Sequence, residues 1–286
     1  MNIILKNASL ILSGNTILDN ISLEIEEGEI CCILGKNGAG KTSLFKCILG
    51  GLPLSSGEVI IGNSILNAKN RENLLHKIGA LLNKTISYDH LSVWQNISII
   101  AQLYSINDPI IYLKTLETVG LINEKDKLVK HLSTGMKQRL GLAIAYVHSP
   151  QFLLLDEPTN TLDPQAIIEF REIIKLLNSK NNVSIVYSTH NIEEAQKLSS
   201  RIIILKDGKI VFDSKKDAVS LYEIAIAPQN NFKEGTKKID FYTNKNDIFI
   251  LYNFMDRDNI HSSFKINSIR SATIEDIYLA KHCAIL

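Results

Sequence analysis

Residues 35–42, with the sequence GKNGAGKT, constrain the fold more than any other part of the chain. They follow the short apolar run 30–34 and precede an amphipathic stretch, 41–49, which Gly50 and Gly51 terminate. The segment matches the pattern G-x-x-x-x-G-K-[S/T] at every fixed position. Glycines at this spacing let successive backbone N–H groups surround an anion, and the N-terminus of the next helix adds positive potential. The segment therefore predicts a strand, a phosphate-binding loop and a helix, in that order.

The side chains of this loop also fit the chemistry of a nucleotide. Lys41 can reach the β- and γ-phosphates, and the hydroxyl of Thr42 or Ser43 can hold Mg²⁺. The alternative is a chance match in an ordinary strand–turn–helix, and the flanking segments weigh against it. The residues expected to contact the nucleotide are Gly35, Lys36, Asn37, Gly38, Ala39, Gly40, Lys41, Thr42 and Ser43.

Two carboxylates follow a second apolar run, at residues 152–155. Such a run is typical of a central parallel strand that is buried on both faces. Because successive side chains point in opposite directions, Asp156 and Glu157 can have different roles. We expect Asp156 to hold Mg²⁺ through a water molecule and Glu157 to polarise the attacking water. An acidic strand end alone is often only solvated, but its combination with the lysine of the loop favours catalysis.

Strand and helix patterns alternate after residue 150, which predicts a parallel sheet with helices on its faces. Asp163 can cap the helix that begins at Pro164. The expected strands are 152–155, 183–187 and 202–205, and the expected helices are 164–179 and 192–199. Upstream, we expect a β-hairpin over 1–30, a strand over 57–66, and mostly helix over 70–150 with loops at 83–92 and 105–109.

The last part of the chain, 216–286, has a different character. The polar stretch 229–238 indicates a linker. The alternating segment 239–252 and the helical pattern 274–282 then indicate a small α+β appendage. We find no internal repeat, and the phosphate-binding pattern occurs once.

The composition argues against several other classes of protein. Among the 286 residues, 45% are hydrophobic and 21% are charged, and the net charge of +1 gives no electrostatic reason to expect nucleic acid as a partner. No apolar run approaches the roughly 18 residues of a membrane helix, and the N-terminus lacks a signal-peptide pattern. We therefore expect an intracellular chain that does not cross a membrane. The four cysteines, Cys31, Cys32, Cys47 and Cys283, form no C-x-x-C pair, so we expect reduced thiols.

Three further segments give the chain a specific resemblance. Residues 132–139, LSTGMKQR, resemble the LSGGQ signature of ATP-binding cassette (ABC) proteins, with Thr for the first Gly and Met for the Gln. Residues 156–163, DEPTNTLD, resemble the acidic strand end and D-loop of that family, and 188–190 resemble its switch-histidine segment. With the phosphate-binding loop, four ordered motifs over residues 1–215 resemble the ATP-binding subunit of an ABC transporter.

The resemblance implies an α/β fold and a domain organisation. It implies a P-loop NTPase core with a parallel sheet, an antiparallel β subdomain and a helical signature subdomain over about 84–148, all within residues 1–215. Residues 216–286 would form the α+β appendage, whose role stays open. The end of this appendage, 273–279, resembles the C-terminal helix common in drug-export cassettes.

The resemblance also implies an ATPase that binds ATP and Mg²⁺ and works as a dimer. Two cassettes would pair head to tail, so that Ser133 and Gly135 of one contact the nucleotide held by the other. A hydroxyl and backbone N–H groups at a helix start suit that role, although a serine at this position is, on its own, more often a plain N-cap. His190 would contact the γ-phosphate and link it to Glu157, and Asp163 would connect the two sites.

The sequence departs from the family pattern at two places. Asn83 stands where the family normally has a Gln that touches Mg²⁺ and senses the membrane subunit, so metal contact and coupling are open there. Leu12 lies near the position of the usual adenine-stacking aromatic residue, which predicts weaker stacking.

The leading interpretation is the motor subunit of a transporter, placed in the cytoplasm on the inner face of the cell membrane. It would act on a separate transmembrane permease, as a homodimer or with a second ABC ATPase. The run 135–145, GMKQRLGLAIA, resembles exporters of drugs and antimicrobial, lantibiotic-type peptides. A soluble ABC ATPase acting on ribosomes or DNA is a second interpretation, against which the single motif set weighs. A small kinase is a third, against which 133–135 and 188–190 argue.

Overall fold

A six-stranded sheet carries both the phosphate-binding loop and the acidic strand end in the computed structural model, which describes residues 1–82, 87–215, 222–228, 240–244, 247–253, 266 and 268–283. Its strand order is β10-β9-β3-β8-β7-β6, and only β10 pairs in the antiparallel direction. The strands are β3 (Ile30–Leu34), β6 (Ile78–Leu82), β7 (Phe152–Asp156), β8 (Ser184–Thr189), β9 (Arg201–Lys206) and β10 (Lys209–Lys215).

The central strands are apolar throughout because both faces of the sheet are covered. Every residue of β3 and of β7 is buried. Side chains alternate between two apolar clusters, so that Cys32 and Leu34 of β3 join one cluster while Cys31 and Ile33 join the other. Burial also raises the pKa of these two thiols, and Cys31, Cys32 and Cys47 are free. These three thiols are buried and form no disulfide with one another, and the Cys283 side chain lies outside the described part.

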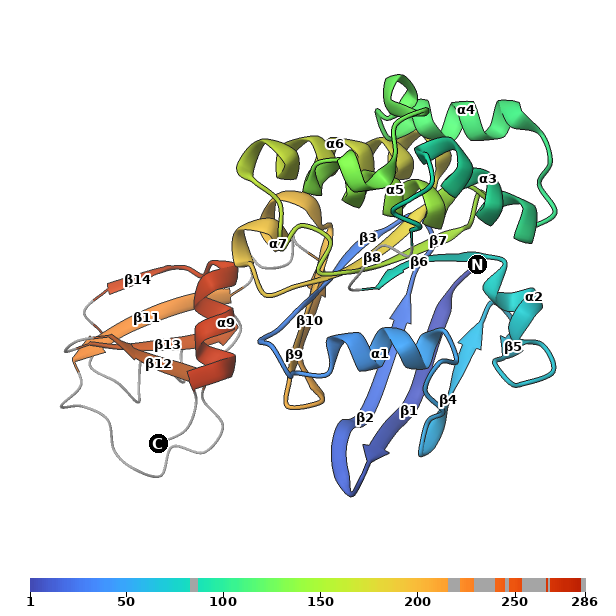
Figure 1. The fold of residues 1–286 in the computed structure, drawn as a ribbon. Coiled ribbons are helices and arrows are strands. Elements are labelled where there is room, and N and C mark those ends of the chain that lie inside the picture. Colours follow the sequence, from blue (N-terminus) through green and yellow to red (C-terminus); the bar gives the residue numbers. More distant parts are fainter. Residues whose placement is uncertain are drawn as a thin grey trace.

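Helices cover one face of this sheet, as Figure 1 shows for α5, α6 and α7. The helices α3 and α4 pack on α5 rather than on the sheet. A capping box starts α3, where Ser92 and Gln95 exchange side-chain-to-backbone hydrogen bonds. The elements are α3 (Val93–Leu103), α4 (Pro109–Thr118), the short 3₁₀ helices η1 (Ile122–Glu124) and η2 (Val129–His131), α5 (Thr134–Tyr146), α6 (Pro164–Asn181) and α7 (Ile192–Leu198).

The opposite face packs against α1 and a smaller antiparallel sheet of order β2-β1-β4-β5. In Figure 1 this sheet and α1 lie on the side away from α5 and α6. Apolar residues of both sheets form one cluster with Leu44 and Phe45 of α1. The elements are α1 (Lys41–Ile48), β1 (Ile3–Leu12), β2 (Asn15–Ile25), β4 (Ser56–Ile61), β5 (Ser64–Ile65) and the short helix α2 (Arg71–Leu75).

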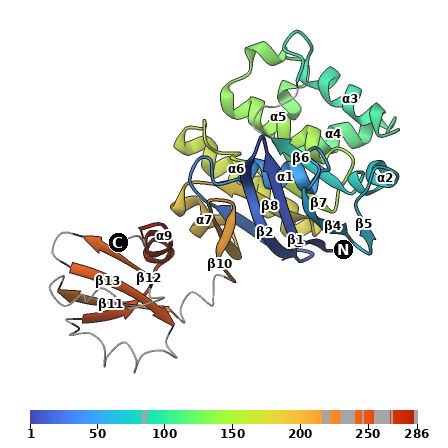
Figure 2. The same cartoon turned by 90° about the horizontal axis from the view of Figure 1, so that it is seen from below.

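A third sheet, of order β12-β13-β11-β14, forms a C-terminal unit together with helix α9. In Figures 1 and 2 it lies beside the main sheet, on the side of α7 and β10. The helix packs against β12, β13 and α7, and its buried Ile277 belongs to the same apolar cluster as the helical face of the main sheet. The elements are β11 (Tyr222–Pro228), β12 (Asp240–Asn244), β13 (Asp247–Asn253), β14 (Ser268–Ser271) and α9 (Ile274–Cys283).

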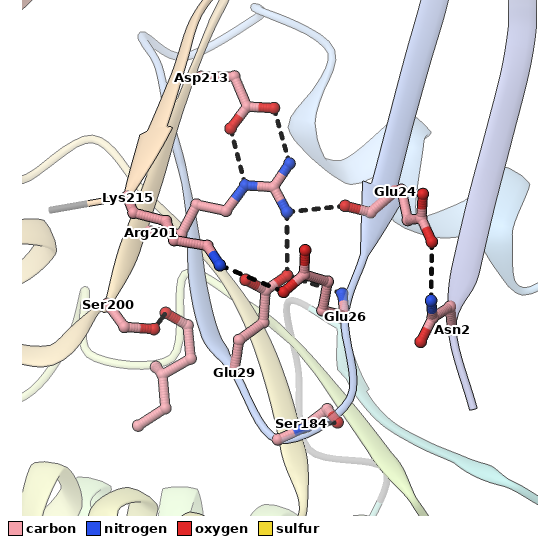
Figure 3. A network of polar contacts seen from close by, with 11 residues as sticks. Asn2, Glu24, Glu26, Glu29, Ser184, Ser200, Arg201, Asp213 and Lys215 are labelled. Atoms are coloured by element: carbon pink, nitrogen blue, oxygen red, sulfur yellow. Dashed lines mark hydrogen bonds and ion pairs between the residues drawn. The ribbon is translucent and has the colours of Figure 1, made fainter. Parts of the chain in front are cut away.

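A network around Arg201 holds β10 where it leads toward this unit (Figure 3). The guanidinium of Arg201 donates two hydrogen bonds of 2.7 Å to the carboxylate of Asp213. It donates two more, to the carbonyl oxygen of Glu24 at 2.7 Å and to the carboxylate of Glu29 at 3.1 Å. Four charge-assisted bonds from one fork-shaped cation therefore tie β9 to β10, to the end of β2 and to the turn between β2 and β3.

The α/β fold class with a parallel sheet and an antiparallel sheet is confirmed. One expectation was wrong in part, because the segment 70–150 contains the strand β6 as well as helices. That strand is short and carries Gly79, where a Cβ would lie 1.9 Å from the carbonyl oxygen of Ala145 in α5. Three further strands, β10, β11 and β14, were also not expected from the sequence. The expected linker 229–238 lies outside the described residues. None of the helices formed by described residues has the length and apolar character that would let it span a bilayer.

Candidate nucleotide site

The phosphate-binding loop and the residue after β7 line one cavity of about 440 Å³. Most of the lining comes from the loop and from the start of α1. One aliphatic side chain comes from β2, and the segment after β7 supplies a carboxylate and an amide. The lining residues are Ile17, Asn37, Gly38, Gly40, Lys41, Thr42, Ser43, Glu157 and Asn160.

The backbone of the loop has the shape that its glycines predict. Gly38 and Gly40 have φ values of 84° and 106°, in the left-handed region that other residues rarely adopt. A Cβ on Gly35 would lie 2.5 Å from the carbonyl oxygen of Leu205, so the loop lies tightly on the end of β9. At Gly38 an added Cβ would meet nothing within 4 Å, which leaves that side of the loop open. An open concave loop at the start of a helix fits a phosphate group.

Lys41 lies under this loop and joins it to the end of β7. Its side chain is 5% exposed, and its Nζ donates to the carbonyl oxygens of Gly35 at 2.8 Å and of Lys36 at 3.1 Å. The same nitrogen lies 3.0 Å from Oε1 of Glu157. The amine is thus fixed between the loop backbone and a carboxylate, at the position from which a phosphate oxygen would be bound.

Glu157 holds an unusual backbone conformation for a residue with a side chain. Its φ is 48°, in the left-handed region, which costs roughly 1–2 kcal/mol. Its N–H compensates by donating to the carbonyl oxygen of Ser188 at 3.2 Å and to the Ser188 hydroxyl at 3.0 Å. This geometry directs the carboxylate to Lys41 through Oε1 and to His190 through Oε2, which lies 2.7 Å from Nδ1 of that ring.

Asp156 lies beside this carboxylate but faces different partners. It is 2% exposed and accepts a hydrogen bond of 2.6 Å from the Thr42 hydroxyl and one of 2.5 Å from the Ser188 hydroxyl. A buried carboxylate next to the hydroxyl at the start of α1 supplies oxygen ligands of the kind that Mg²⁺ prefers. The residues present therefore fit both a nucleotide phosphate and its magnesium ion.

The residues of the resembled signature and D-loop lie elsewhere. Ser133 is exposed at the start of α5, and its hydroxyl accepts a hydrogen bond of 3.2 Å from the N–H of Met136. Asp163 is exposed at the start of α6, where it accepts a bond of 2.9 Å from the N–H of Ala166. A Cβ on Gly135 would lie 3.1 Å from the Ala166 Cβ, so the two helix starts are neighbours. Among the described residues, neither start contributes to the cavity lining.

Some residues of the site were not anticipated, and one anticipated residue cannot be placed. Ile17 and Asn160 line the cavity, and the Ser188 hydroxyl bonds the carboxylate of Asp156 and the backbone N–H of Glu157. The only signal for Asn160 was its place within the D-loop segment, whereas Ile17 reaches the cavity from a distant strand. Asn83 lies outside the described residues. Leu12, at the end of β1, is 39% exposed.

Comparison with protein families and curated proteins gives a consistent result. Residues 18–160 match the family model described as ABC transporter. The bacitracin transport ATP-binding protein BcrA of Bacillus licheniformis is 36% identical over 219 residues, which cover 74% of this chain and 71% of the relative. The lantibiotic transport ATP-binding protein SrtF of Streptococcus pyogenes is 36% identical over 202 residues, which cover 71% of this chain and 86% of the relative.

Solved structures show the same fold. The chain resembles cbiO1 from Clostridium perfringens, part of the ABC transporter complex cbiONQ, with a TM-score of 0.70 and 26% identity over 76% of this chain and 89% of that one. It also resembles the dimeric ATP-binding cassette MJ0796 bound to ADP and Pi, with a TM-score of 0.68 and 27% identity over 74% of this chain and 98% of that one.

Proposed function

Because the chain belongs to the ABC transporter family as an ATP-binding subunit with ATPase activity, we propose that it drives a separate membrane permease that exports an antimicrobial peptide or drug. It would do so from the cytoplasm, on the inner face of the cell membrane. The relatives whose names refer to bacitracin and lantibiotic transport support this class of substrate.

The observation that carries the catalytic part of the proposal is the position of Glu157 between Lys41 and His190. Its two carboxylate oxygens lie 3.0 Å and 2.7 Å from a lysine amine and an imidazole nitrogen. A carboxylate held in this way at the rim of a phosphate-binding cavity can accept the proton of an attacking water. In this assignment His190 fixes the carboxylate from the other side, and Lys41 stabilises negative charge on the phosphate oxygens.

The loop residues, from Gly35 to Ser43, would bind the nucleotide phosphates through backbone N–H groups. We assign Thr42 and Asp156 to the magnesium site, with Asn83 as a further ligand from outside the described residues. When bound there, Mg²⁺ would neutralise negative charge on the phosphate oxygens. The Ser188 hydroxyl keeps Asp156 directed toward Thr42 through its bond of 2.5 Å.

The exposed starts of α5 and α6 support a dimeric form of the site. Ser133 and Gly135 would contact the nucleotide held by a second cassette, and Asp163 would connect the two sites. An exposed helix start with a free face is suited to an anion from a partner chain. The similarity to a dimeric cassette bound to ADP and Pi supports this arrangement. The second cassette would be another copy of this chain or a related ATPase.

The transporter assignment is tested by capturing the partner. A tagged Glu157→Gln variant would be produced in the native cell, membranes would be solubilised gently with ATP present, and co-purifying proteins would be identified by mass spectrometry. The expected result is a multi-spanning membrane protein. A Lys41→Ala, Glu157→Gln double variant is the control, because it should not form the nucleotide-dependent dimer. Recovery of ribosomal or DNA-associated proteins without a membrane protein would overturn the transporter assignment and leave the ATPase standing.

The export assignment needs a separate experiment in the same cells. Loss of the gene should increase sensitivity to bacitracin or to lantibiotics, and the wild-type gene should restore resistance. Glu157→Gln should fail to restore it, whereas Glu172→Gln, which changes an exposed glutamate on α6, should succeed. Unchanged sensitivity to a panel of such peptides would contradict peptide export.

A further inference from the structure

The turn between β9 and β10 touches the phosphate-binding loop directly. The N–H of Gly208 in this turn donates a hydrogen bond of 3.1 Å to the carbonyl oxygen of Ala39 in the loop. The carbonyl oxygen of Gly208 accepts one of 2.9 Å from the N–H of Asp19 on β2. Leu205, just before the turn, lies so close to Gly35 that a Cβ there would clash. A shift of this turn therefore displaces the backbone that forms the phosphate cradle.

The same turn holds the end of the C-terminal helix. The Nζ of Lys206 donates to the carbonyl oxygens of Lys281 at 3.0 Å and of His282 at 3.4 Å. These carbonyls belong to the last turn of α9, at the carbonyl end of the helix. One side chain thus connects the C-terminal unit to the turn that supports the loop.

The other end of α9 is fixed within its own unit. Asp276 accepts hydrogen bonds from the N–H and the hydroxyl of Thr273 at 2.7 Å and pairs with Arg270 through bonds of 2.6 and 2.7 Å. Ile277 is fully buried in the cluster that includes Ile224 and Leu251 of the C-terminal sheet. The helix is thereby fixed to the sheet of its unit, and its C-terminal end contacts Lys206.

Electrostatics gives the sign of the effect. The C-terminal end of a helix carries partial negative charge, and Lys206 places a positive charge against it here. Burial, together with the positive charges of Lys36 and Lys206, lowers the pKa of His282 at this end of the helix. Without the lysine, the negative end of the helix would oppose the binding of a phosphate anion, and a turn released from α9 would loosen the cradle.

We propose that Lys206 is a positioning residue through which the C-terminal unit raises the affinity of the phosphate-binding loop for nucleotide. The inference rests on the nucleotide site assigned above. The C-terminal unit then has a regulatory role. Displacement of α9 would weaken nucleotide binding and leave the residues that perform hydrolysis unchanged.

The test is the Lys206→Met variant of the full chain, which keeps the length of the side chain and removes its donor and charge. The dissociation constant for ATP should rise roughly twofold to fivefold, while the turnover rate at saturating ATP stays at the wild-type value. Lys209→Met is the matched control. It removes a positive charge from the same turn, but Lys209 pairs with Asp19 at 3.0 Å rather than with α9, so ATP affinity should not change.

A second variant acts from the other side of the contact. Ile277→Ala loosens α9 without altering the turn, and it should weaken ATP binding in the same direction. The Lys206→Met, Ile277→Ala double variant should bind ATP no more weakly than the weaker single variant, because both changes break one connection. Wild-type affinity in Lys206→Met, or an equal loss in Lys209→Met, would overturn the inference. A wild-type chain that binds no ATP would overturn both this inference and the nucleotide site.

Discussion

The Nζ of Lys41 and Oε1 of Glu157 lie 3.0 Å apart, so the lysine under the phosphate-binding loop and the carboxylate after β7 form an ion pair. Both side chains are largely buried, at 5% and 15% exposed, which strengthens their attraction relative to a pair in water. A phosphate that binds at the loop must compete with this carboxylate for the lysine. In the proposed site, binding of the anion would free Oε1 of Glu157 from the lysine and leave the carboxylate paired with His190 through Oε2.

Glu157→Gln should keep ATP binding and abolish turnover. The neutral amide no longer competes for Lys41, so affinity for ATP should stay the same or increase, and a nucleotide-dependent dimer should accumulate. Loss of the base should lower the hydrolysis rate about 10²- to 10⁴-fold. Phosphate release and size-exclusion chromatography with ATP measure the two effects, with Glu172→Gln as control. Hydrolysis near the wild-type rate would remove Glu157 from its assigned role.

Lys41→Ala should lose nucleotide affinity. The variant removes the charge that faces the phosphate and leaves the carbonyl oxygens of Gly35 and Lys36 without their donor. Titration with a fluorescent ATP analogue should show no saturable binding at concentrations that saturate the wild type. Lys46→Ala, at an exposed position on the same helix, should bind normally. Equal binding by Lys41→Ala and the wild type would contradict the phosphate site.

Asp156→Asn should increase the magnesium requirement. The amide keeps the size of the side chain but weakens the oxygen cluster that it forms with Thr42. The Mg²⁺ concentration for half-maximal hydrolysis should rise roughly 10- to 100-fold. The exposed Asp126→Asn serves as control. An unchanged magnesium curve for Asp156→Asn would show that the ion is held by other residues.

Arg201→Met should destabilise the fold without altering nucleotide binding. The change leaves Glu29, whose side chain is 9% exposed, and Asp213 without their shared cation. We expect a loss of about 3 kcal/mol in the free energy of unfolding, measured with urea at neutral pH. Burial already raises the pKa of Glu29, so the loss should diminish on acidification, where a protonated carboxyl needs no counter-charge. Arg201→Lys should recover only part of the stability, because it lacks the two-pronged contact with Asp213. A loss below about 1 kcal/mol would indicate that these ion pairs contribute no more than solvent-exposed pairs do.

Stability should also fall on mild acidification because of His148. This ring stacks on Tyr104 with centroids 3.9 Å apart, and burial, aided by His76, lowers its pKa from 6.5 to about 4. Between these two values the unfolded chain binds a proton that the folded chain does not, so unfolding becomes easier as the pH falls. Thermal unfolding between pH 7 and pH 4 should reveal this slope, and His148→Phe, which retains the stack, should reduce it. An identical slope in both proteins would contradict the assignment.

The strongest sequence patterns predicted the fold well. The strand 30–34 has the predicted bounds because an uninterrupted apolar run can only be buried on both faces. The helix from Pro164 starts where Asp163 and the proline predict, although it continues to Asn181. By contrast, β6 was hidden in a helical region, since five residues that include Gly79 have too little pattern to separate strand from helix. The polar strand β10 depends on pairing with β9, which composition does not reveal.

The sequence predicts which residues belong to the site, but not which of their side chains contact one another. Sequence order gives Lys41, Asp156, Glu157 and His190 as candidates, yet their pairing depends on how β3, β7 and β8 align in one sheet. The left-handed backbone of Glu157 has no sequence signature, since Glu is not among the residues that favour it. The link from Lys206 to α9 joins residues far apart in the chain through backbone carbonyls, which leave no trace in side-chain patterns.

The close contact between Gly79 and Ala145 also restricts which residues can replace this glycine in natural variants. A Cβ at position 79 would lie 1.9 Å from a carbonyl oxygen and 2.7 Å from the side chain of Leu153, so even alanine would force α5 away from β6. Many glycines can drift to other small residues where only a turn is at stake. Here every replacement would separate the helix that begins after Ser133 from the sheet whose strand β7 leads to Glu157. We therefore expect natural variants to keep glycine at this position.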